Sequence, residues 1–314
     1  DNLFELFPNG FYQSIYNKKE FNQLQIDPDK PIEKGEKFQP QPQQVLASRY
    51  ASTRTIYDRQ MILHSMGVGK TALAVLTVEN NLGRGFIGAV IATPSKKFFD
   101  TFITEIVKIT GDKYFPEKHE DKSPDELRRA IRSKIKKVYK MITFEAFANS
   151  IEKIQQEGGL AATQLRNEYS NRIIIVDEAH NLRIQPDKKA DTSRVNKAFH
   201  LLLHSVENTK VLLMTGTPMK DRWNEIADLA NLILPEDKQL ASGDAFDREF
   251  PNDGKTIENV QVLKERLKGM ISTLKTIPSK VKREFIGTNL PELDLFKLDL
   301  SRMSEFQEKY YLEA

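Results

Sequence analysis

The sequence predicts an α/β fold in which helices cover both faces of a parallel β-sheet. Two observations support this prediction: short apolar runs recur along the chain, and longer polar or amphipathic segments separate them. The apolar runs are MILH (61–64), AVIAT (89–93), VYKMI (138–142), IIIVD (173–177) and VLLMT (211–215). Each is short enough to be a buried strand, and helical connections between consecutive strands are what a parallel sheet requires.

Two regions lie outside this alternation. Residues 1–45 include PDKPIEKGEKFQPQPQQ (28–44), whose proline and glutamine content predicts an extended N-terminal extension. Residues 236–290 are charged at first and then have a helical pattern through VQVLKERLKGMISTLK (260–275), which predicts a helical appendage. The main sheet domain is therefore expected within residues 46–235.

One connecting segment, SPDELRRAIRSKIKK (123–137), contains a clear helix start. Ser123 is the expected N-cap and Pro124 begins the first turn. Asp125 and Glu126 follow, where the positive end of the helix dipole favours negative charge. We therefore expect a helix from Pro124.

The composition excludes several classes of protein. Without cysteine, the chain forms no disulfides, has no catalytic thiol and binds no zinc through thiolates. No apolar run approaches the roughly 20 residues of a membrane-spanning helix. The first residues, DNLFELFPNGFYQ, lack the basic start of a secretory signal. We expect a protein that is neither secreted nor embedded in a membrane.

The stretch HSMGVGKT (64–71) has the composition of a phosphate-binding loop. Such a loop needs glycines that let backbone N–H groups face the phosphates, a helix N-terminus, a lysine and a hydroxyl group. These groups are supplied by Gly67, Gly69, Lys70 and Thr71. His64 stands where the signature GxxxxGK[ST] has its first glycine. A glycine-rich turn without a ligand is the alternative interpretation.

A second candidate element is the acidic pair in IIIVDEAHNL (173–182). Asp177 and Glu178 follow four β-branched residues at the carboxyl end of a predicted strand, where open parallel sheets bind their ligands. Asp177 would face a metal ion that accompanies the phosphates, and Glu178 would orient or deprotonate an attacking water. The alternative is that these acidic residues only form a turn.

Together with neighbouring segments, these two elements resemble the motifs of superfamily 2 helicases and translocases. HSMGVGKT resembles motif I, DEAH (177–180) resembles motif II, and MTGTPMKD (214–221) resembles motif III. VIATPSKKFFDTF (90–102) resembles motif Ia, and ITFEAFAN (142–149) resembles motif Ib. Their order is that of the first domain of this superfamily, so the resemblance implies a RecA-like P-loop NTPase domain over residues 46–235.

The resemblance assigns ATP and Mg²⁺ to the first two motifs. ATP is expected to bind at the loop residues Gly67, Val68, Gly69, Lys70, Thr71 and Ala72. Thr71 and Asp177 are expected to hold the magnesium ion. Catalysis is expected to depend on Lys70, Asp177 and Glu178. Related proteins place an adenine-reading glutamine upstream of the loop, and Gln43 and Gln44 are both candidates for it.

Thr93, Lys96 and Thr143 are expected to contact nucleic acid. Thr93 and Lys96 lie in the segment that resembles motif Ia, and Thr143 lies in the segment that resembles motif Ib. Hydroxyl groups and lysines suit a nucleic-acid backbone. The alternatives are a lysine that is merely solvated and a threonine that merely caps the following helix.

His180, Thr215 and Thr217 are expected to couple the nucleotide site to the bound strand. The two threonines flank Gly216 at the end of the strand VLLM, and the coupling would run through His180 of the DEAH segment. The alternative is that the threonine hydroxyls only satisfy the turn that Pro218 begins, and that the histidine is structural.

Two further segments carry narrower resemblances. GTPMKDRWNEIADLANLILPEDKQL (216–240) is similar to the D6/D11-like ATPases of large cytoplasmic DNA viruses, of the early transcription factor small subunit and nucleoside triphosphate phosphohydrolase I type. LPELDLFKLDLSRMSEFQEKYY (290–311) resembles the strand and helix through which Swi/Snf-like ATPases begin their second RecA-like domain. Residues 291–314 are therefore expected to lead into that domain.

The expected second domain carries motifs IV to VI and the arginine fingers of the family, which have no counterpart in these 314 residues. Residues 1–314 alone are therefore expected to bind ATP weakly and to hydrolyse it slowly. Arg222 is the candidate for a finger within the chain.

The resemblance implies an ATP-dependent helicase or translocase of a viral transcription or replication machinery that moves on DNA or RNA. One alternative is a Swi/Snf-like or restriction-system DNA translocase. Another is a transcription factor subunit that recruits RNA polymerase to a promoter and uses ATP hydrolysis as a release switch. The expected protein partners are viral RNA polymerase or transcription factor subunits, and the expected location is the host cytoplasm, in viral factories, or the virion.

Overall fold

The computed structural model describes residues 13, 15, 17–24, 38–53, 55–117, 122–158, 160–185, 188–253, 256–274, 288–290 and 293–298. The chain divides into two compact units, Asp1–Lys275 and Thr276–Ala314. The candidate site lies in the first unit.

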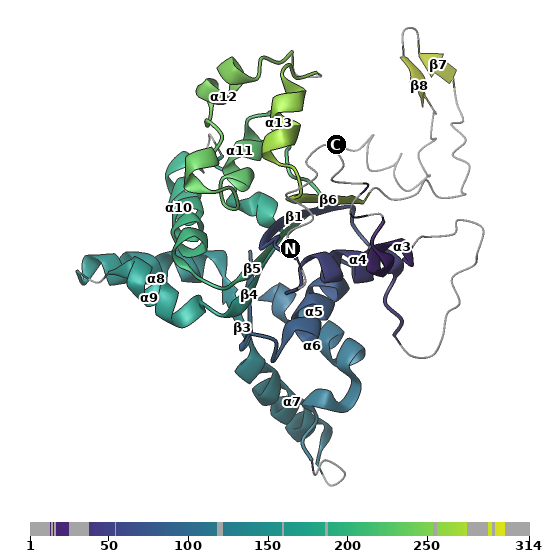
Figure 1. Ribbon diagram of the computed structural model, residues 1–314, viewed down its shortest axis with the longest axis vertical. Coiled ribbons are helices and arrows are strands. Elements are labelled where there is room, and N and C mark those ends of the chain that lie inside the picture. Colours follow the sequence, from purple (N-terminus) through teal and green to yellow (C-terminus); the bar gives the residue numbers. More distant parts are fainter. Residues whose placement is uncertain are drawn as a thin grey trace, which may run out of the picture. The chain divides into compact units, whose positions relative to one another are not determined.

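The first unit is built on a parallel six-stranded sheet (Figure 1). Its strands are β1 (Arg59–His64), β2 (Gly88–Thr93), β3 (Tyr139–Thr143), β4 (Arg172–Asp177), β5 (Lys210–Thr215) and β6 (Ile271–Leu274). They lie side by side in the order β3-β2-β4-β5-β1-β6, and every neighbouring pair is parallel. The predicted parallel α/β fold is confirmed, with β1 to β5 at the five apolar runs. The third run is displaced by one residue because Val138 ends the preceding helix.

Strand β6 lies where the sequence indicated a helix. The segment 260–275 is helical only over α13 (Val260–Arg266), and Ile271–Leu274 then pair with Met61–His64 of β1. The helical interpretation is wrong for these four residues. Pairing with an otherwise exposed edge strand supplies backbone hydrogen bonds that outweigh the weak local helix preference of ISTL.

Helices cover both faces of this sheet (Figure 1). The helices on one face are α4 (Pro42–Tyr50), α5 (Lys70–Asn81), α6 (Lys97–Thr110) and α7 (Pro124–Val138). Those packed against the other face are α8 (Phe144–Gln156), α9 (Ala161–Tyr169), α10 (Lys189–Ser205), α11 (Glu225–Ala230) and α12 (Asp244–Glu249). The short helices are α3 (Lys19–Asn22), η2 (Gly111–Tyr114), η3 (Ala179–Leu182) and η5 (Glu236–Lys238). None of the helices in the described ranges is long and apolar enough to cross a membrane.

The two faces have separate apolar cores because successive strand residues point to opposite sides. Met61 of β1 belongs to the core beneath α8 to α12, whereas Ile62 belongs to the core beneath α4 to α7. Phe246 and Phe250, at and after α12, are fully buried in the first of these cores. The segment expected as an appendage therefore packs into the same unit as the sheet.

The start of α7 follows the sequence prediction. Ser123 is the N-cap, its Oγ accepts a hydrogen bond from the Glu126 backbone N–H at 3.3 Å, and its own N–H donates to Glu126 Oε2 at 3.0 Å. This reciprocal capping box satisfies two backbone N–H groups that the helix cannot satisfy internally.

The N-terminal extension is less extended than expected. Pro42, Gln43 and Gln44 form the first turn of α4, so the extended interpretation of 28–44 is wrong for its last three residues. Gln41 caps this helix, because its N–H donates to Gln44 Oε1 at 2.9 Å. Residues 25–37 lie outside the described part of the chain.

In the second unit, β7 (Thr288–Leu290) and β8 (Leu293–Leu298) form an antiparallel pair. The strand expected near LPELDLFKLDL is therefore present. The helix expected in SRMSEFQEKYY falls outside the described residues.

Candidate active site

The loop of residues 65–69 connects β1 to α5 at the carboxyl edge of the sheet. Gly67 and Gly69 have φ angles of 78° and 81°, a left-handed conformation that glycine adopts at little cost. A Cβ atom at Gly69 would lie 2.2 Å from Gln44 Nε2, so the Gln44 side chain would have to shift to accommodate it. Helix α5 begins at Lys70, which places its free N-terminal N–H groups behind the loop.

His64 explains why the first glycine of the signature is dispensable here. It is the last residue of β1 and is only 3% exposed. Its Nε2 lies 3.0 Å from Ser272 Oγ of β6. The position has strand conformation, and its side chain bonds to the neighbouring strand, so neither a left-handed backbone nor a missing Cβ is needed.

His64 should make the stability of the protein depend on pH. Burial, and secondly the charge of Lys70, lowers the pKa of His64 to about 4. The unfolded state, with a pKa near 6.5, therefore binds more protons than the folded state between about pH 6.5 and pH 4. We expect the free energy of unfolding to fall across this window as the pH is lowered, by on the order of 2 kcal/mol from this residue.

Denaturant unfolding of the wild type and of His64→Asn, measured at intervals from pH 7 to pH 4, checks this. The variant retains a hydrogen-bonding side chain but does not titrate, so the stability difference between the two proteins should narrow or reverse as the pH falls. A pH-independent difference would contradict the assignment.

Lys70 is held at the loop. Its Nζ donates to the backbone carbonyls of His64 at 3.0 Å and of Ser65 at 3.2 Å. Both acceptors are neutral, so a phosphate oxygen would compete favourably for the same ammonium group. The side chain is therefore available to a phosphate at this loop.

Asp177 and Glu178 lie at the carboxyl end of β4, and β5 separates this strand from β1. Asp177 is buried, and that burial, followed by the charge of Glu178, raises the pKa of Asp177 to about 6. A buried carboxylate beside a second one favours a cation in their vicinity. Asp177 therefore fits a magnesium ligand, as does the hydroxyl of Thr71 in the first turn of α5.

Glu178 has a φ angle of 52°, which is unusual for a residue with a side chain. Its carbonyl oxygen accepts hydrogen bonds from the backbone N–H and the Nδ2 of Asn181, both at 3.0 Å. These bonds hold the strained turn that begins η3. The turn separates the direction of the Glu178 side chain from that of Asp177.

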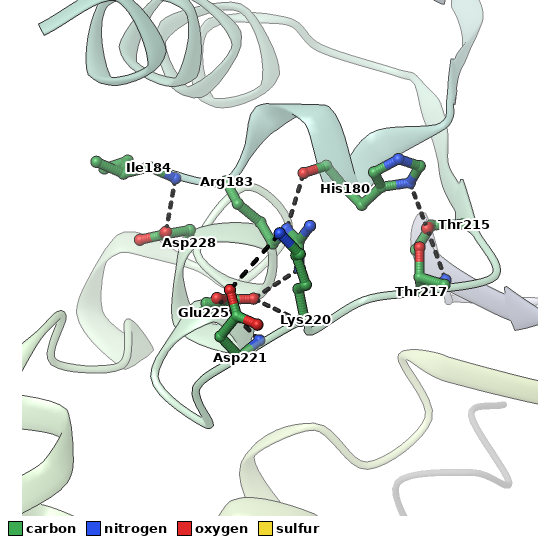
Figure 2. Close-up of polar contacts among 9 residues, drawn as sticks. All are labelled: His180, Arg183, Ile184, Thr215, Thr217, Lys220, Asp221, Glu225 and Asp228. Carbon is green, nitrogen blue, oxygen red and sulfur yellow. Dashed lines mark hydrogen bonds and ion pairs between the residues drawn. The ribbon is translucent and has the colours of Figure 1, made fainter. Parts of the chain in front are cut away.

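His180 joins this turn to the end of β5 (Figure 2). Its Nδ1 lies 3.0 Å from Thr215 Oγ1, which also accepts a hydrogen bond from the Thr217 N–H at 3.1 Å. The same Nδ1 lies 3.3 Å from Glu178 Oε2. Burial lowers the pKa of His180, which favours the neutral ring at pH 7. The three residues expected to act in coupling are thus in one chain of contacts beside Glu178.

Comparison with known proteins identifies the family. The model of the SNF2-related domain matches residues 57–314. The chain belongs to the SNF2-related domain family. The matched region includes the loop, the acidic turn and the end of β5 described above.

Several relatives of this SNF2-related chain come from viruses. "Putative helicase 087L" of Invertebrate iridescent virus 3 is 28% identical over 341 residues, which cover 99% of this chain and 31% of that protein. The early transcription factor 70 kDa subunit of Melanoplus sanguinipes entomopoxvirus is 24% identical over 294 residues, which cover 86% of this chain and 36% of that protein. The chain spans about a third of the length of these curated relatives. The resemblance to ATPases of large DNA viruses is confirmed.

A solved structure supports the same fold. The Sulfolobus solfataricus SWI2/SNF2 ATPase core in complex with dsDNA is similar with a TM-score of 0.53 and 19% identity, over 76% of this chain and 45% of that chain. The likeness concerns the fold, and it agrees with the predicted RecA-like ATPase domain.

The three residues of this SNF2-related domain that are expected to contact nucleic acid lie in different environments. Thr93 is fully buried and its Oγ1 donates to the Ser95 carbonyl at 2.9 Å, so its hydroxyl stabilises a turn. Thr143 is the N-cap of α8, and its Oγ1 accepts from the Ala146 N–H at 3.3 Å. Lys96 is exposed, and with Thr143 it lines a cavity of about 350 Å³. Lys96 and Thr143 therefore share one surface, whereas Thr93 lies beneath it.

Gln44 and Gln43 are also distinguished. Gln44 is 5% exposed, and its Nε2 donates to the Gly69 carbonyl at 3.1 Å. It therefore contacts the loop of residues 65–69 directly, whereas Gln43 is half-buried on α4.

Sequence reasoning missed two charged residues beside the site. Arg183 and Glu225 form an ion pair between the segment after DEAH and α11, with Arg183 Nη1 2.6 Å from Glu225 Oε2. They belong to no short motif and lie 42 positions apart. Their pairing therefore has no local signature.

Proposed function

We propose that this SNF2-related domain is the first ATPase domain of a nucleic-acid-dependent helicase or translocase in a viral transcription or replication machinery. The observation that carries the proposal is the contact chain from Glu178 through His180 to Thr215 and Thr217. It connects the residues suited to hydrolysis with a loop at the same edge of the sheet.

Each site residue has a separate role in the proposed ATP hydrolysis. The N–H groups of the loop and the ammonium group of Lys70 bind and orient the phosphates of ATP. Thr71 and Asp177 would hold magnesium, which neutralises phosphate charge when bound. Glu178 orients the attacking water and accepts its proton, and the neutral His180 ring keeps Glu178 in place. Gln44, in contact with the loop, is our choice for the residue that reads adenine.

Lys96 and Thr143 are proposed to contact the backbone of the bound strand. Lys96 presents an exposed positive charge beside the cavity that it shares with Thr143, and positive charge supplies most sequence-independent affinity for nucleic acid. Thr93 is proposed to act by shaping the turn that presents Lys96, since its hydroxyl bonds to Ser95.

The domain division is part of the proposal. Residues 46–235 form the RecA-like domain, 1–45 an extension and 236–290 an appendage that also supplies β6 to the sheet. Residues 291–314 are proposed to lead into a second RecA-like domain, which would provide arginine fingers. Viral RNA polymerase or transcription factor subunits are the proposed protein partners, and the host cytoplasm or the virion is the proposed location.

The test is ATP hydrolysis by the full-length protein with and without single-stranded DNA, duplex DNA and RNA, followed by strand displacement on the stimulating substrate. We expect stimulation by at least one of these polymers. Lys96→Gln should weaken binding similarly for all sequences and lower the slope of log affinity against log salt concentration by about 1. Lys97→Gln, a neighbouring exposed lysine that does not line the cavity, is the matched control.

Hydrolysis that no nucleic acid stimulates would contradict the motor function. A second candidate, a transcription factor subunit with ATPase as a release switch, is favoured by the likeness to the entomopoxvirus early transcription factor subunit. The two functions differ in one result. A release switch shortens the lifetime of a promoter complex when ATP is added, without displacing a strand or moving along DNA.

A further inference from the structure

A largely buried ion pair joins the segment after η3 to the start of α11 (Figure 2). Arg183, directly after η3, is 8% exposed, and its Nη1 donates to Glu225 Oε2 at 2.6 Å. Glu225 begins α11, which packs on η3. The pair is therefore held in place by the core and is poorly accessible to water.

Arg183 also fixes the backbone of His180. Its Nε donates to the His180 carbonyl oxygen at 2.9 Å, while the His180 ring bonds to Thr215. One guanidinium group thus connects Glu225 to the residue that contacts Glu178. A lysine could not make both contacts with the same planar geometry.

Glu225 fixes the loop that continues from Thr217. Its Oε2 accepts a hydrogen bond from the Lys220 N–H at 2.7 Å, and its Oε1 accepts one from the Asp221 N–H at 3.3 Å. One turn later on α11, Asp228 Oδ2 accepts from the Ile184 N–H at 2.8 Å. Helix α11 thus holds both the segment after DEAH and the loop after β5.

These contacts form a continuous cycle of interactions. It runs from the His180 ring through Thr215 to the loop of residues 216–221, then through Glu225 and Arg183 back to the His180 carbonyl. Moving the loop away from Glu225 would break its two backbone hydrogen bonds, and separating Glu225 from Arg183 would leave a buried charge unpaired, which is strongly unfavourable. The loop and His180 are therefore linked through Glu225 and Arg183.

We propose that Arg183 and Glu225 are positioning residues that transmit the state of the 216–221 loop to His180 and Glu178. The inference rests on the proposed function, because it requires nucleic-acid binding to act on that loop. In this scheme the pair neither binds ATP nor touches the reacting atoms. It determines how strongly the bound strand accelerates hydrolysis.

The experiment compares the wild type, Arg183→Gln, Glu225→Gln and Arg194→Gln in the full-length protein. Arg194 pairs with Glu145 and Glu152 between α10 and α8, so it is a matched control for loss of an ion pair. We expect the first two variants to lose about tenfold in stimulation of kcat by nucleic acid. Their KM for ATP without nucleic acid should equal that of the wild type, and Arg194→Gln should be stimulated normally.

The double variant Arg183→Gln with Glu225→Gln covers the case in which a single change prevents folding. It leaves no buried charge unpaired and keeps an acceptor for Lys220 and Asp221. We expect it to fold and to be stimulated no better than either single variant. Wild-type stimulation in the folded double variant would overturn the inference, as would a rise in KM that matches the loss of stimulation. If the wild type itself is not stimulated, it is the proposed function that fails.

Discussion

Replacing Lys70 with alanine is expected to lower ATP hydrolysis by about 10²–10³-fold and to weaken ATP binding. Among the described residues, the ammonium group bonds to the neutral carbonyls of His64 and Ser65, so the charged β- and γ-phosphates can compete for it. Alanine removes this charge but leaves the glycine conformations and the start of α5 intact. The measurements are steady-state phosphate release and the affinity for a fluorescent ATP analogue.

Lys97→Ala, at the exposed start of α6, is the control for loss of a lysine. Thermal unfolding of both variants should be close to that of the wild type, because Lys70 is only half-buried and water can replace its ammonium group at the two carbonyls. Unchanged affinity and turnover in Lys70→Ala would refute the assignment of residues 64–71 as a phosphate loop.

The second large effect is expected from Glu178→Gln, which should hydrolyse ATP about 10²–10⁴-fold more slowly while binding it normally. Glutamine preserves the length of the side chain and an oxygen that can face His180, but it cannot accept a proton from water. The strained turn should persist because Asn181 bonds to the backbone carbonyl of residue 178.

Single-turnover hydrolysis and nucleotide binding separate these effects. Glu157→Gln, an exposed position at the end of α8, is the matched control. Retention of most of the wild-type rate in Glu178→Gln would assign water activation to another group. Combined with Lys70→Ala, the result distinguishes a residue that binds phosphate from one that acts in the chemical step.

The elements that the sequence predicted well are those with a local signature. Strands β1 to β5 are continuous apolar runs, and a run of this kind is buried wherever its sheet forms. The loop of residues 65–69 combines two left-handed glycines with the start of a helix within a few residues. The cap of α7 and the acidic turn after β4 are equally local. Each of these features is determined by residues that are close together in the sequence.

The features that the sequence did not predict depend on partners far along the chain. Ile271–Leu274 form a strand because they pair with the edge of β1. Nothing in the sequence of these four residues indicates that this edge is available for pairing. The hydroxyl of Thr93 bonds within its own turn, which leaves Lys96 and Thr143 to line the exposed cavity.

The sequence by itself thus determined the parallel α/β fold, the glycine-containing turn before α5 and the acidic turn after β4, because each is encoded in a contiguous stretch whose geometry is set by local backbone preferences. Only the tertiary structure decided that Gln44 contacts the loop, that His180 meets Thr215, and that Arg183 pairs with Glu225. These contacts join segments that are 25 to 42 positions apart. Many pairs of residues in the chain are separated by similar distances in sequence. Only the packing of α4 and α11 in the folded unit determines which of these pairs are in contact.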